Sequence, residues 1–395
     1  MLGVGDADLR RDILSGLPGL CRDVPAYGAY GTIRRWGDLP TITKRDILES
    51  PQAFVSRSAA ATEPLWAKAT SGTTGRPITL FADTVTHVYR VYLSVLQVLM
   101  RARLQRLFDA PVLWLHLTDS PSATARLLLF PDDYAGAMFK VSVVSQPSVP
   151  DLASLLARVR PAVLATRPEI LRMLLRGSFA ASLHRAGWSP DLVVLSGSAS
   201  SAAERRGFAE QLQCPVVNAY ASSEFGLIAS ECPHGHMHVD PGAAVAEAVT
   251  VGDQQTLVLS SVANRAMPLL RYITGDAGMA RHARWPCGES GTAVVGLEGR
   301  LVPLFETRAG NPYSPTALND LLMALPVDDF CARQTRPGSI EILIDLPGAP
   351  LLGVERAVEA YVRARVPDEV DVVVHRHVFG TTKRHRYVVV QDQPS

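Results

Sequence analysis

The 395-residue chain is long enough to bury a large core and exceeds the usual size of one compact unit, so we expect two domains of unequal size. Apolar residues make up 47% of the chain and charged residues 19%, a composition typical of folded soluble proteins. The 39 basic and 38 acidic residues nearly balance, which excludes a global field that would draw the protein to nucleic acid or to an anionic membrane.

The start of the chain and its cysteines favour the cytoplasm. Residues 1–14 read MLGVGDADLRRDIL, with acids and arginines where a signal peptide needs a basic end and an apolar run. The most apolar long stretch, residues 91–100, is far shorter than a bilayer requires. Five scattered cysteines are unlike the disulfide framework of a secreted protein. We therefore expect a cytoplasmic protein without a membrane partner.

Strand-like and helix-like segments alternate through the first two thirds of the chain. Apolar residues at three- and four-residue spacing predict an amphipathic helix over 83–107, and short β-rich runs follow at 111–117, 161–166, 191–197 and 215–220. Helix-like segments begin at Pro168 and Ser201, and Ser201 with Glu204 resembles a capping box. This alternation predicts an α/β fold with mostly parallel sheets.

The pattern changes towards the end of the chain. After Thr256, shorter strands and Gly-rich turns predict a more antiparallel subdomain. Beyond Gly299 the chain reads as a strand, a helix and two further strands, at 339–346, 353–366, 371–378 and 386–390. We therefore expect a large domain over 1–300 with mixed, mostly parallel sheets and an antiparallel subdomain, and a small α+β domain over 301–395.

A loop rich in Ser, Thr and Gly lies between two apolar stretches at 69–81, ATSGTTGRPITLF. Its glycines would let backbone N–H groups approach an anion, and its hydroxyls would donate hydrogen bonds. The chain has no P-loop, no G-x-G-x-x-G pattern, no G-x-S-x-G elbow and no H-E-x-x-H helix, which excludes the simplest nucleotide-binding and hydrolase classes. From these residues alone, both a phosphate-binding loop and a solvated turn stay open.

TSGTTGRP, residues 70–77, resembles the [ST]-S-G-[ST]-T-G-x-P signature of the adenylate-forming superfamily, which includes acyl-CoA synthetases, peptide-synthetase adenylation domains and beetle luciferases. Ile78 stands where a lysine often follows. DLPTITKRDI, residues 38–47, resembles the entry segment of the phenylacetate:CoA ligase and capsular-biosynthesis branch. The resemblance implies that the outer phosphates of ATP are held by Thr70, Ser71, Gly72, Thr73, Thr74 and Gly75.

Further motifs follow in the order that this family has them. VLSGSAS, residues 194–200, resembles the turn that contacts adenine, and NAYASSEFG, residues 218–226, resembles the Y-G-x-[ST]-E motif. Carried over by position, the adenine contacts fall on Ser198, Ala199, Ser200 and Tyr220, the phosphate contacts on Ser222 and Ser223, and Mg²⁺ on Glu224. LLRYITGDAG, residues 269–278, resembles the ribose motif and assigns Asp276 to the ribose, with Tyr272 and Thr274 in support.

Two motifs near the small domain complete the set. GLEGR, residues 296–300, resembles the end of the large domain in the family and makes Arg300 a ribose or phosphate contact. GTTKRHRYVVV, residues 380–390, resembles the C-terminal segment that carries the catalytic lysine, which matches Lys383. The resemblance thus implies a mobile small domain, with Lys383 and Glu224 as catalytic residues.

The implied activity is ATP- and Mg²⁺-dependent formation of an acyl-AMP from an aromatic or small carboxylic acid, with release of pyrophosphate. The acyl group then passes to a thiol, either coenzyme A or a carrier protein. The oligomeric state stays open, with a homodimer as one option. Two alternatives stay open: transfer to an amine, hydroxyl or inorganic nucleophile, and a non-catalytic nucleotide-binding module.

A cluster of sulfur and imidazole side chains lies in ECPHGHMHVD, residues 231–240, and RWPCGES, residues 284–290. Such ligands suit tetrahedral zinc. Some members of the branch bind a structural zinc, and the matching positions are Cys232, His238 and Cys287. Trp285 and Glu289 replace two residues of the branch pattern, so His236 or His234 would have to complete the site. A structural zinc site and a metal-free histidine loop both remain open.

Overall fold

The computed structural model describes residues 6–69, 78–90, 94–104, 112–118, 125–129, 137–144, 152–175, 179–240, 242–251, 254–300, 305–313, 321–322, 325, 327, 329–346, 351–365, 370–379 and 387–389. The chain divides into two compact units, Met1–Gly299 and Arg300–Ser395. The division lies one residue before the boundary expected from the sequence. The described helices are all too short or too polar to cross a bilayer.

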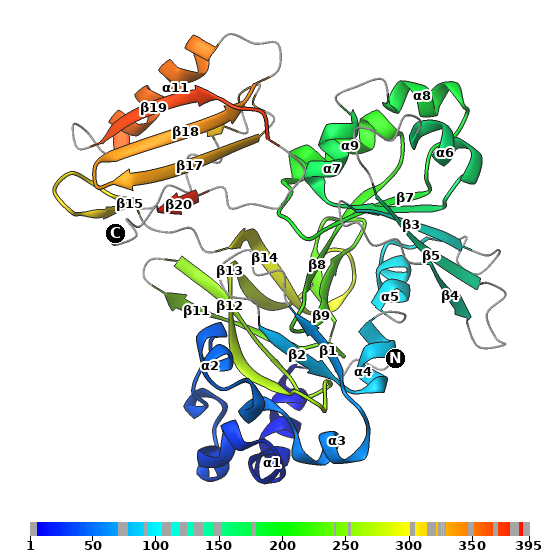
Figure 1. The fold of residues 1–395 in the computed structure, drawn as a ribbon, viewed down its shortest axis with the longest axis vertical. Helices are drawn as coiled ribbons and strands as arrows, with labels where there is room; N and C mark the ends of the chain where they lie inside the picture. Colours follow the sequence, from blue (N-terminus) through cyan, green and yellow to red (C-terminus); the bar gives the residue numbers. More distant parts are fainter. Residues whose placement is uncertain are drawn as a thin grey trace. The chain divides into compact units, whose positions relative to one another are not determined.

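The larger unit is built on one twelve-stranded sheet, with the strands in the order β11-β12-β13-β14-β10-β9-β8-β7-β6-β3-β5-β4 (Figure 1). The run β5-β3-β6-β7-β8 is parallel, and its neighbours on both sides pair antiparallel. The strands are β3 (Val112–Thr118), β4 (Ala125–Leu129), β5 (Ala137–Val144), β6 (Val163–Thr166), β7 (Leu192–Ser196), β8 (Val216–Ser222), β9 (Gly226–Glu231), β10 (Met237–Val239), β11 (Val245–Val251), β12 (Gln254–Ser261), β13 (Leu269–Arg284) and β14 (Ser290–Arg300).

The predicted mixed α/β architecture is confirmed, but its antiparallel part differs in two ways from the expectation. It begins at β9 rather than after Thr256, because Ser222 pairs with Gly226 across a short turn and such a turn can only join antiparallel strands. It is also continuous with the parallel strands in one sheet. The strands β4 and β5 were not predicted from the sequence.

Helices cover both faces of the parallel strands, because successive side chains of a strand point to opposite faces. On one face, α5 (Ser94–Arg101) packs on a cluster that includes Trp114 and Val194. On the other face, Leu115 and Val193 pack against four helices. These are α6 (Leu152–Val159), α7 (Pro168–Leu175), α8 (Phe179–Arg185) and α9 (Ala202–Leu212).

Two predicted helix features are modified in the structure. Within the helix expected over 83–107, the structure has α4 (Thr84–Val88), continued by the π-helical Tyr89 and Arg90, and then α5, which ends at Arg101. Ser201 caps α9 as expected, because its hydroxyl accepts from the Glu204 backbone N–H at 3.0 Å. The Glu204 carboxylate does not complete a capping box. It forms a buried ion pair with Arg172 of α7 instead.

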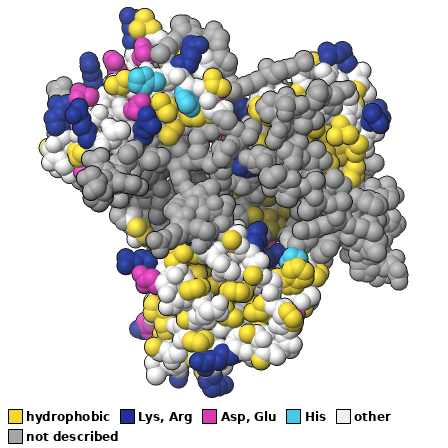
Figure 2. Space-filling model, viewed as in Figure 1, with side chains coloured by type: hydrophobic (Ala, Val, Ile, Leu, Met, Phe, Trp, Pro, Cys, Tyr) yellow, Lys and Arg dark blue, Asp and Glu magenta, His cyan; other side chains and the backbone are white. Residues whose placement is uncertain are grey.

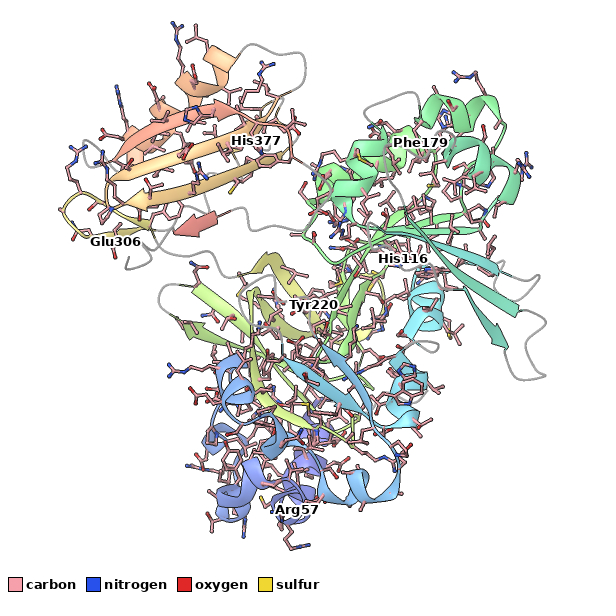
Figure 3. The ribbon with its side chains drawn as sticks, viewed as in Figure 1. Arg57, His116, Phe179, Tyr220, Glu306 and His377 are labelled. Atoms are coloured by element: carbon pink, nitrogen blue, oxygen red, sulfur yellow. The ribbon has the colours of Figure 1, made fainter. Side chains whose placement is uncertain are left out.

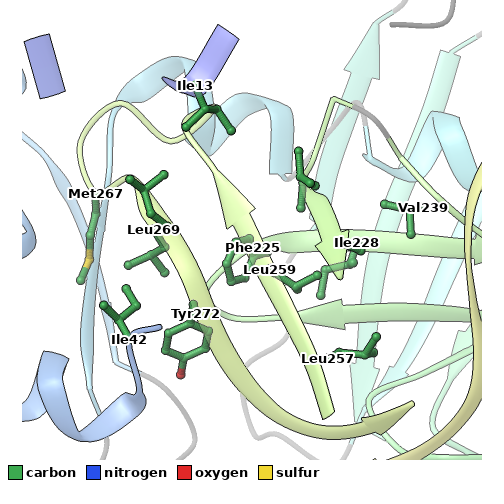
Figure 4. Close-up of a cluster of buried hydrophobic side chains, with 14 of the residues drawn as sticks. Ile13, Ile42, Phe225, Ile228, Val239, Leu257, Leu259, Met267, Leu269 and Tyr272 are labelled. Carbon is green, nitrogen blue, oxygen red and sulfur yellow. The ribbon is translucent and has the colours of Figure 1, made fainter. Parts of the chain in front are cut away.

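The antiparallel strands pack against the N-terminal helices α1 (Asp6–Asp23) and α2 (Lys44–Glu49). The short helix α3 (Arg57–Thr62) follows α2 in the chain and has no buried residue. Figure 4 shows part of this core, with Phe225 and Tyr272 among aliphatic side chains from β9, β12 and β13. Both aromatic residues belong to motifs singled out in the sequence. The core therefore supports the candidate site directly.

Asp83, the N-cap of α4, is expected to stabilise the larger unit above pH 4 and to lose this effect in acid. It is 2% exposed, and its carboxylate accepts from the Thr86 N–H, the Thr86 hydroxyl and the Arg265 N–H at 2.8, 3.0 and 3.1 Å. Burial raises the pKa of Asp83, but these hydrogen bonds and the Arg265 charge outweigh burial, so the pKa lies below its ordinary value. A carboxyl whose pKa is lower in the folded state than in the unfolded state stabilises the fold at pH values above its unfolded-state pKa. This contribution is lost as the pH falls towards the folded-state pKa.

Asp83→Ala should therefore lower the free energy of unfolding of the larger unit by about 1–2 kcal/mol at pH 7, the usual cost of losing an N-cap. The difference from wild type should shrink as the pH falls below about 4. Urea titrations at pH 7 and pH 3 measure it. Asp8→Asn, at an exposed ion pair with Arg11, is the control and should change the free energy by less than about 0.5 kcal/mol. An equal difference at both pH values would contradict the account.

The smaller unit is an α+β module with the strand order β19-β18-β17-β20. Its elements are β15 (Phe305–Glu306), β16 (Pro312–Tyr313), β17 (Asp329–Arg336), β18 (Ser339–Asp345), α11 (Leu351–Arg365), β19 (Asp371–Arg376) and β20 (Tyr387–Val389). The sequence patterns predicted β18, α11, β19 and β20 and missed the polar strand β17. On the face of this unit seen in Figure 2, basic and acidic side chains are interspersed. Arg308 and Asp371 of this unit form an ion pair between exposed side chains.

Candidate nucleotide and metal sites

The strands on either side of the Ser/Thr/Gly loop form a hairpin. β1 (Trp66–Ala69) pairs antiparallel with β2 (Thr79–Ala82), and Ala69 lies opposite Thr79. The predicted phosphate contacts Thr70, Ser71, Gly72, Thr73, Thr74 and Gly75 lie outside the described residues. So does Lys383, and the side chain of Arg300 at the end of β14 is also outside them.

Tyr220 and Asp276, predicted to bind adenine and ribose, meet in the larger unit. The Tyr220 hydroxyl donates to Asp276 Oδ2 at 2.6 Å, and the two residues are 8% and 9% exposed. Figure 3 labels Tyr220 on β8, and Asp276 lies on β13. The Asp276 backbone is held as well, since its N–H donates to the Thr274 hydroxyl at 3.0 Å. Two residues 56 positions apart in the chain thus form one buried polar pair.

Glu224, the predicted Mg²⁺ ligand, lies in the turn between β8 and β9. The Tyr272 hydroxyl donates to Glu224 Oε1 at 3.2 Å, and the Arg90 guanidinium donates to the Glu224 backbone carbonyl. Gly226 permits this approach, because a Cβ there would lie 2.9 Å from Arg90 Cγ and the residue has φ +77°. The turn is closed by the Phe225 N–H, which donates to Ser222 Oγ at 3.2 Å.

The predicted adenine turn, residues 198–200, connects β7 to α9. Ser198 Oγ is buried and has no hydrogen-bond partner within the part of the chain that the structure describes. Buried hydroxyls are nearly always paired, so this atom is suited to a ligand. Ser200 is held from α9, because Arg205 Nη1 donates to its carbonyl at 2.5 Å and lies 3.3 Å from its hydroxyl.

Four metal-binding side chains converge in the same unit. The ligand atoms of Cys232, His236, His238 and Cys287 all lie within 4.8 Å of one another. Cys287 Sγ lies 3.3 Å from His238 Nε2, and Cys232 Sγ lies 3.9 Å from His236 Nδ1. Ligands at 2.0–2.3 Å from a tetrahedral zinc ion are separated by roughly 3.3–3.8 Å. The donor types suit zinc, and the Cys287–His238 separation lies within this range, while the Cys232–His236 separation is slightly longer. His236, and not the exposed His234, belongs to the group.

Trp285 and Glu289, the two residues that differ from the branch pattern, both lie next to this cluster. Trp285 packs its ring against His236 and His238, with ring centroids 5.1 and 6.0 Å apart. Glu289 Oε2 lies 3.8 Å from His238 Nδ1 and 3.6 Å from Arg101 Nε. A carboxylate on the far nitrogen of a ligating histidine is a common way to orient the imidazole towards a metal.

Burial favours the ligand form of His238 but not that of Cys232. Burial lowers the pKa of His238, Glu289 opposes the shift, and Arg101 and His236 add to it, so the imidazole is held neutral. Burial raises the pKa of the Cys232 thiol, and neighbouring Cys287 adds to the shift. A divalent cation would favour the thiolate, because its positive charge stabilises the deprotonated sulfur.

Several residues of the site were not identifiable from the sequence. Arg90 and Arg205 belong to no motif, and Glu231 was noted only as the first residue of the Cys/His segment. Arg90 contacts Glu224 and Arg205 contacts Glu231, which are distant in the chain. The only local signal was their position within or beside apolar segments, where charged residues are rarely buried without a partner.

No protein-family model matches the chain. A phenylacetate-coenzyme A ligase of Thermus thermophilus is 26% identical over 310 residues, which are 73% of this chain and 66% of that protein. A 2-hydroxyisobutyryl-CoA ligase structure in the postadenylation state has a TM-score of 0.68 at 15% identity, over 99% of this chain and 91% of its own.

Two further structures match most of the chain, with TM-scores of 0.52 and 0.50. ATP-bound MatB from Rhodopseudomonas palustris has a TM-score of 0.52 at 16% identity, covering 78% of this chain and 63% of its own. The anthranilate CoA ligase AuaEII with anthranoyl-AMP has a TM-score of 0.50 at 16% identity, covering 79% and 63%. The chain has the fold of the adenylate-forming superfamily. Within it, the sequence is phenylacetate-CoA ligase-like, as the motifs predicted.

Proposed function

We propose that the protein is an AMP-forming ligase that activates a carboxylic acid with ATP and then transfers the acyl group to a thiol. One observation carries this proposal: Tyr220 bonds to Asp276 while Tyr272 bonds to Glu224, so residues of two separate nucleotide motifs meet in two polar pairs. The similarity to a phenylacetate-coenzyme A ligase supports the acid-activating chemistry.

In the first half-reaction, a carboxylate oxygen attacks the α-phosphorus of ATP and the bond to the β-phosphate oxygen breaks. Pyrophosphate leaves and an acyl-AMP forms. Asp276 would accept from the ribose hydroxyls, and Tyr220 would present its ring to adenine while its hydroxyl holds the carboxylate. The loop of Thr70 to Gly75 would bind the outer phosphates. Positioning and charge stabilisation therefore supply the rate.

Glu224 offers the hard oxygen ligand that Mg²⁺ prefers, and the ion would spread the negative charge of the phosphates. Tyr272 and Arg90 hold this residue from both its carboxylate and its backbone. In the second half-reaction, a thiol sulfur attacks the acyl carbon, AMP leaves and the thiol proton passes to solvent. We propose coenzyme A or a carrier protein as the thiol, and an aromatic or small acid as the substrate.

The Cys/His cluster, which consists of Cys232, His236, His238 and Cys287, is proposed to hold a structural Zn²⁺. Two thiolates and two imidazoles close a tetrahedral site and leave no position for a substrate, which separates this metal from the chemistry. We further propose that the enzyme works as a homodimer in the cytoplasm.

Acid-dependent release of pyrophosphate tests the proposed activity. The protein is incubated with ATP, Mg²⁺, coenzyme A and each of a panel of aromatic and small acids, and the products are separated by mass spectrometry. An acyl-CoA product supports transfer to a thiol. Acyl-AMP that accumulates without a thioester would favour an amine, hydroxyl or inorganic acceptor. ATP binding without pyrophosphate release would favour a non-catalytic nucleotide-binding module.

Lys383→Ala is expected to reduce acid-dependent pyrophosphate release by about 10²- to 10³-fold, because a positive charge that meets developing negative charge contributes on this scale. ATP affinity should change much less. Lys44→Ala in α2 serves as the lysine control and should retain the wild-type rate. Equal rates for wild type and Lys383→Ala would remove the catalytic role assigned to this residue.

A further inference from the structure

A buried ion pair between Glu231 and Arg205 lies next to the Cys/His cluster in the chain. Glu231 is the last residue of β9, directly before Cys232, and is 5% exposed. Its Oε1 accepts from Arg205 Nη2 at 2.6 Å, and its Oε2 accepts from the Asn218 N–H at 2.9 Å. Both carboxylate oxygens are thus committed to partners on neighbouring elements, α9 and β8. Any movement of the strand end that carries Cys232 would change these bonds.

The same guanidinium reaches the predicted adenine turn with its other arm. Arg205 Nη1 donates to the Ser200 carbonyl at 2.5 Å, while Nη2 bonds to Glu231. The side chains of Arg205 and Glu231 are only 14% and 6% exposed. A planar guanidinium with donors in a fixed fork transmits position better than a flexible ammonium does. Two hydrogen bonds and the peptide bond between Glu231 and Cys232 therefore join Cys232 to Ser200 through Arg205.

We propose that Arg205 and Glu231 are positioning residues that couple the Cys/His cluster to the adenine turn at 198–200. Zn²⁺ bound by Cys232 fixes the end of β9, Glu231 then holds Arg205, and Arg205 holds Ser200 in the position that binds the nucleotide. The nucleotide part of this inference rests on the proposed function. The coupling is reciprocal, so a bound nucleotide also slows the loss of zinc.

The chain contains a matched control for a merely structural role. Arg172 of α7 forms a buried ion pair with Glu204, also on α9, with side chains 11% and 7% exposed. This pair resembles Arg205 with Glu231 in burial and chemistry, and it joins α7 to α9 through the bonds from Arg172 Nε and Nη2 to Glu204 Oε1. Arg172→Ala should therefore loosen α9 without affecting the coupling.

Hydrogen exchange tests the coupling without any nucleotide. Amide exchange of residues 197–201 is measured by mass spectrometry in protein stripped with a chelator and in protein reloaded with ZnCl₂. In wild type and Arg172→Ala, zinc should slow exchange of this segment at least about fivefold, the lower end of ordinary coupling between sites. In Arg205→Ala, zinc should leave it unchanged. Wild-type exchange that does not respond to zinc overturns the inference.

ATP binding and zinc release give the second readout. Calorimetry should show ATP binding weakened about tenfold by Arg205→Ala and by stripping zinc from wild type, with no further loss when the two are combined. ATP should slow zinc capture by a chromogenic chelator in wild type and not in Arg205→Ala. Arg205→Lys should be intermediate, because an ammonium cannot serve both partners equally well.

A second variant guards against misfolding. Arg205→Met combined with Glu231→Gln removes both charges, so no unpaired charge stays buried. It should fold and still lack the zinc response. Zinc-dependent protection of residues 197–201 in this variant overturns the inference. If wild type fails to bind ATP, the proposed function falls, while the exchange experiment still decides the coupling.

Discussion

Asp276→Asn is expected to reduce kcat/KM for ATP by about 10- to 100-fold while the protein stays folded. The asparagine oxygen can still accept from the Tyr220 hydroxyl, which lies 2.6 Å from Oδ2, so the buried pair is kept. The negative charge that would accept from the ribose hydroxyls is lost. A hydrogen bond to a charged group contributes roughly 1.5–3 kcal/mol, and about 1.4 kcal/mol corresponds to a tenfold change.

Tyr220→Phe should have a smaller effect, about fivefold, because it removes one neutral donor and keeps the ring. Tyr27→Phe is its control, since Tyr27 is also buried and its hydroxyl donates to the Pro268 carbonyl at 2.9 Å and accepts from the Leu270 N–H at 3.2 Å. Both tyrosine variants should lose similar stability, and only Tyr220→Phe should lose ATP affinity. Steady-state kinetics and calorimetry measure these changes. Wild-type kcat/KM in Asp276→Asn would remove the ribose assignment.

Removal of zinc is expected to destabilise the larger unit strongly. A ligand that binds only the folded state stabilises it by about 4 kcal/mol when its concentration is a thousand times its dissociation constant. Each kcal/mol corresponds to a shift of roughly 2–4 °C in the unfolding temperature for a unit of this size. Scanning calorimetry with and without a chelator should therefore show a fall of about 10 °C, and metal analysis should show one zinc per chain.

Cys287→Ser should abolish the stoichiometric zinc and the response to the chelator. Cys287 Sγ lies 3.3 Å from His238 Nε2, so its loss opens the group of four ligands. Cys214→Ser is the control, because Cys214 is 8% exposed and packs in a different core cluster, with Leu212 and Phe208. It should lower stability while keeping the metal. Wild-type protein without zinc and without a chelator effect would leave the metal-free histidine loop as the correct interpretation.

Local sequence patterns anticipated much of the fold, wherever neighbouring residues decide the outcome. Strands β6, β7 and β8 and helices α9 and α11 were predicted from apolar periodicity, and Ser201 from its capping pattern. Strand β17 was missed because its exposed face is polar and its buried Gln334 is satisfied by the backbone of Glu306. Its strand character depends on the neighbours it pairs with.

For the candidate site too, the sequence identified some residues and left others open. The resemblance of short motifs to those of the adenylate-forming family was enough to assign Tyr220, Glu224 and Asp276 to the nucleotide site, and Cys232 and Cys287 to a candidate metal site. Each motif is itself a short local pattern of residue types. The sequence left open whether His234 or His236 completes the cluster. In the structure, His236 is the one that lies with Cys232, His238 and Cys287.

The tertiary structure alone placed the residues that connect these motifs. Arg90 reaches Glu224 across 134 positions, Tyr220 reaches Asp276 across 56, and Arg205 reaches Glu231 across 26. Such contacts depend on which strands are neighbours and in what register, and a one-residue shift of register turns a side chain to the opposite face. Local periodicity carries no information about that pairing. Where two charged side chains meet, as Arg205 and Glu231 do, burial makes each need the other, because a buried charge is costly without a partner.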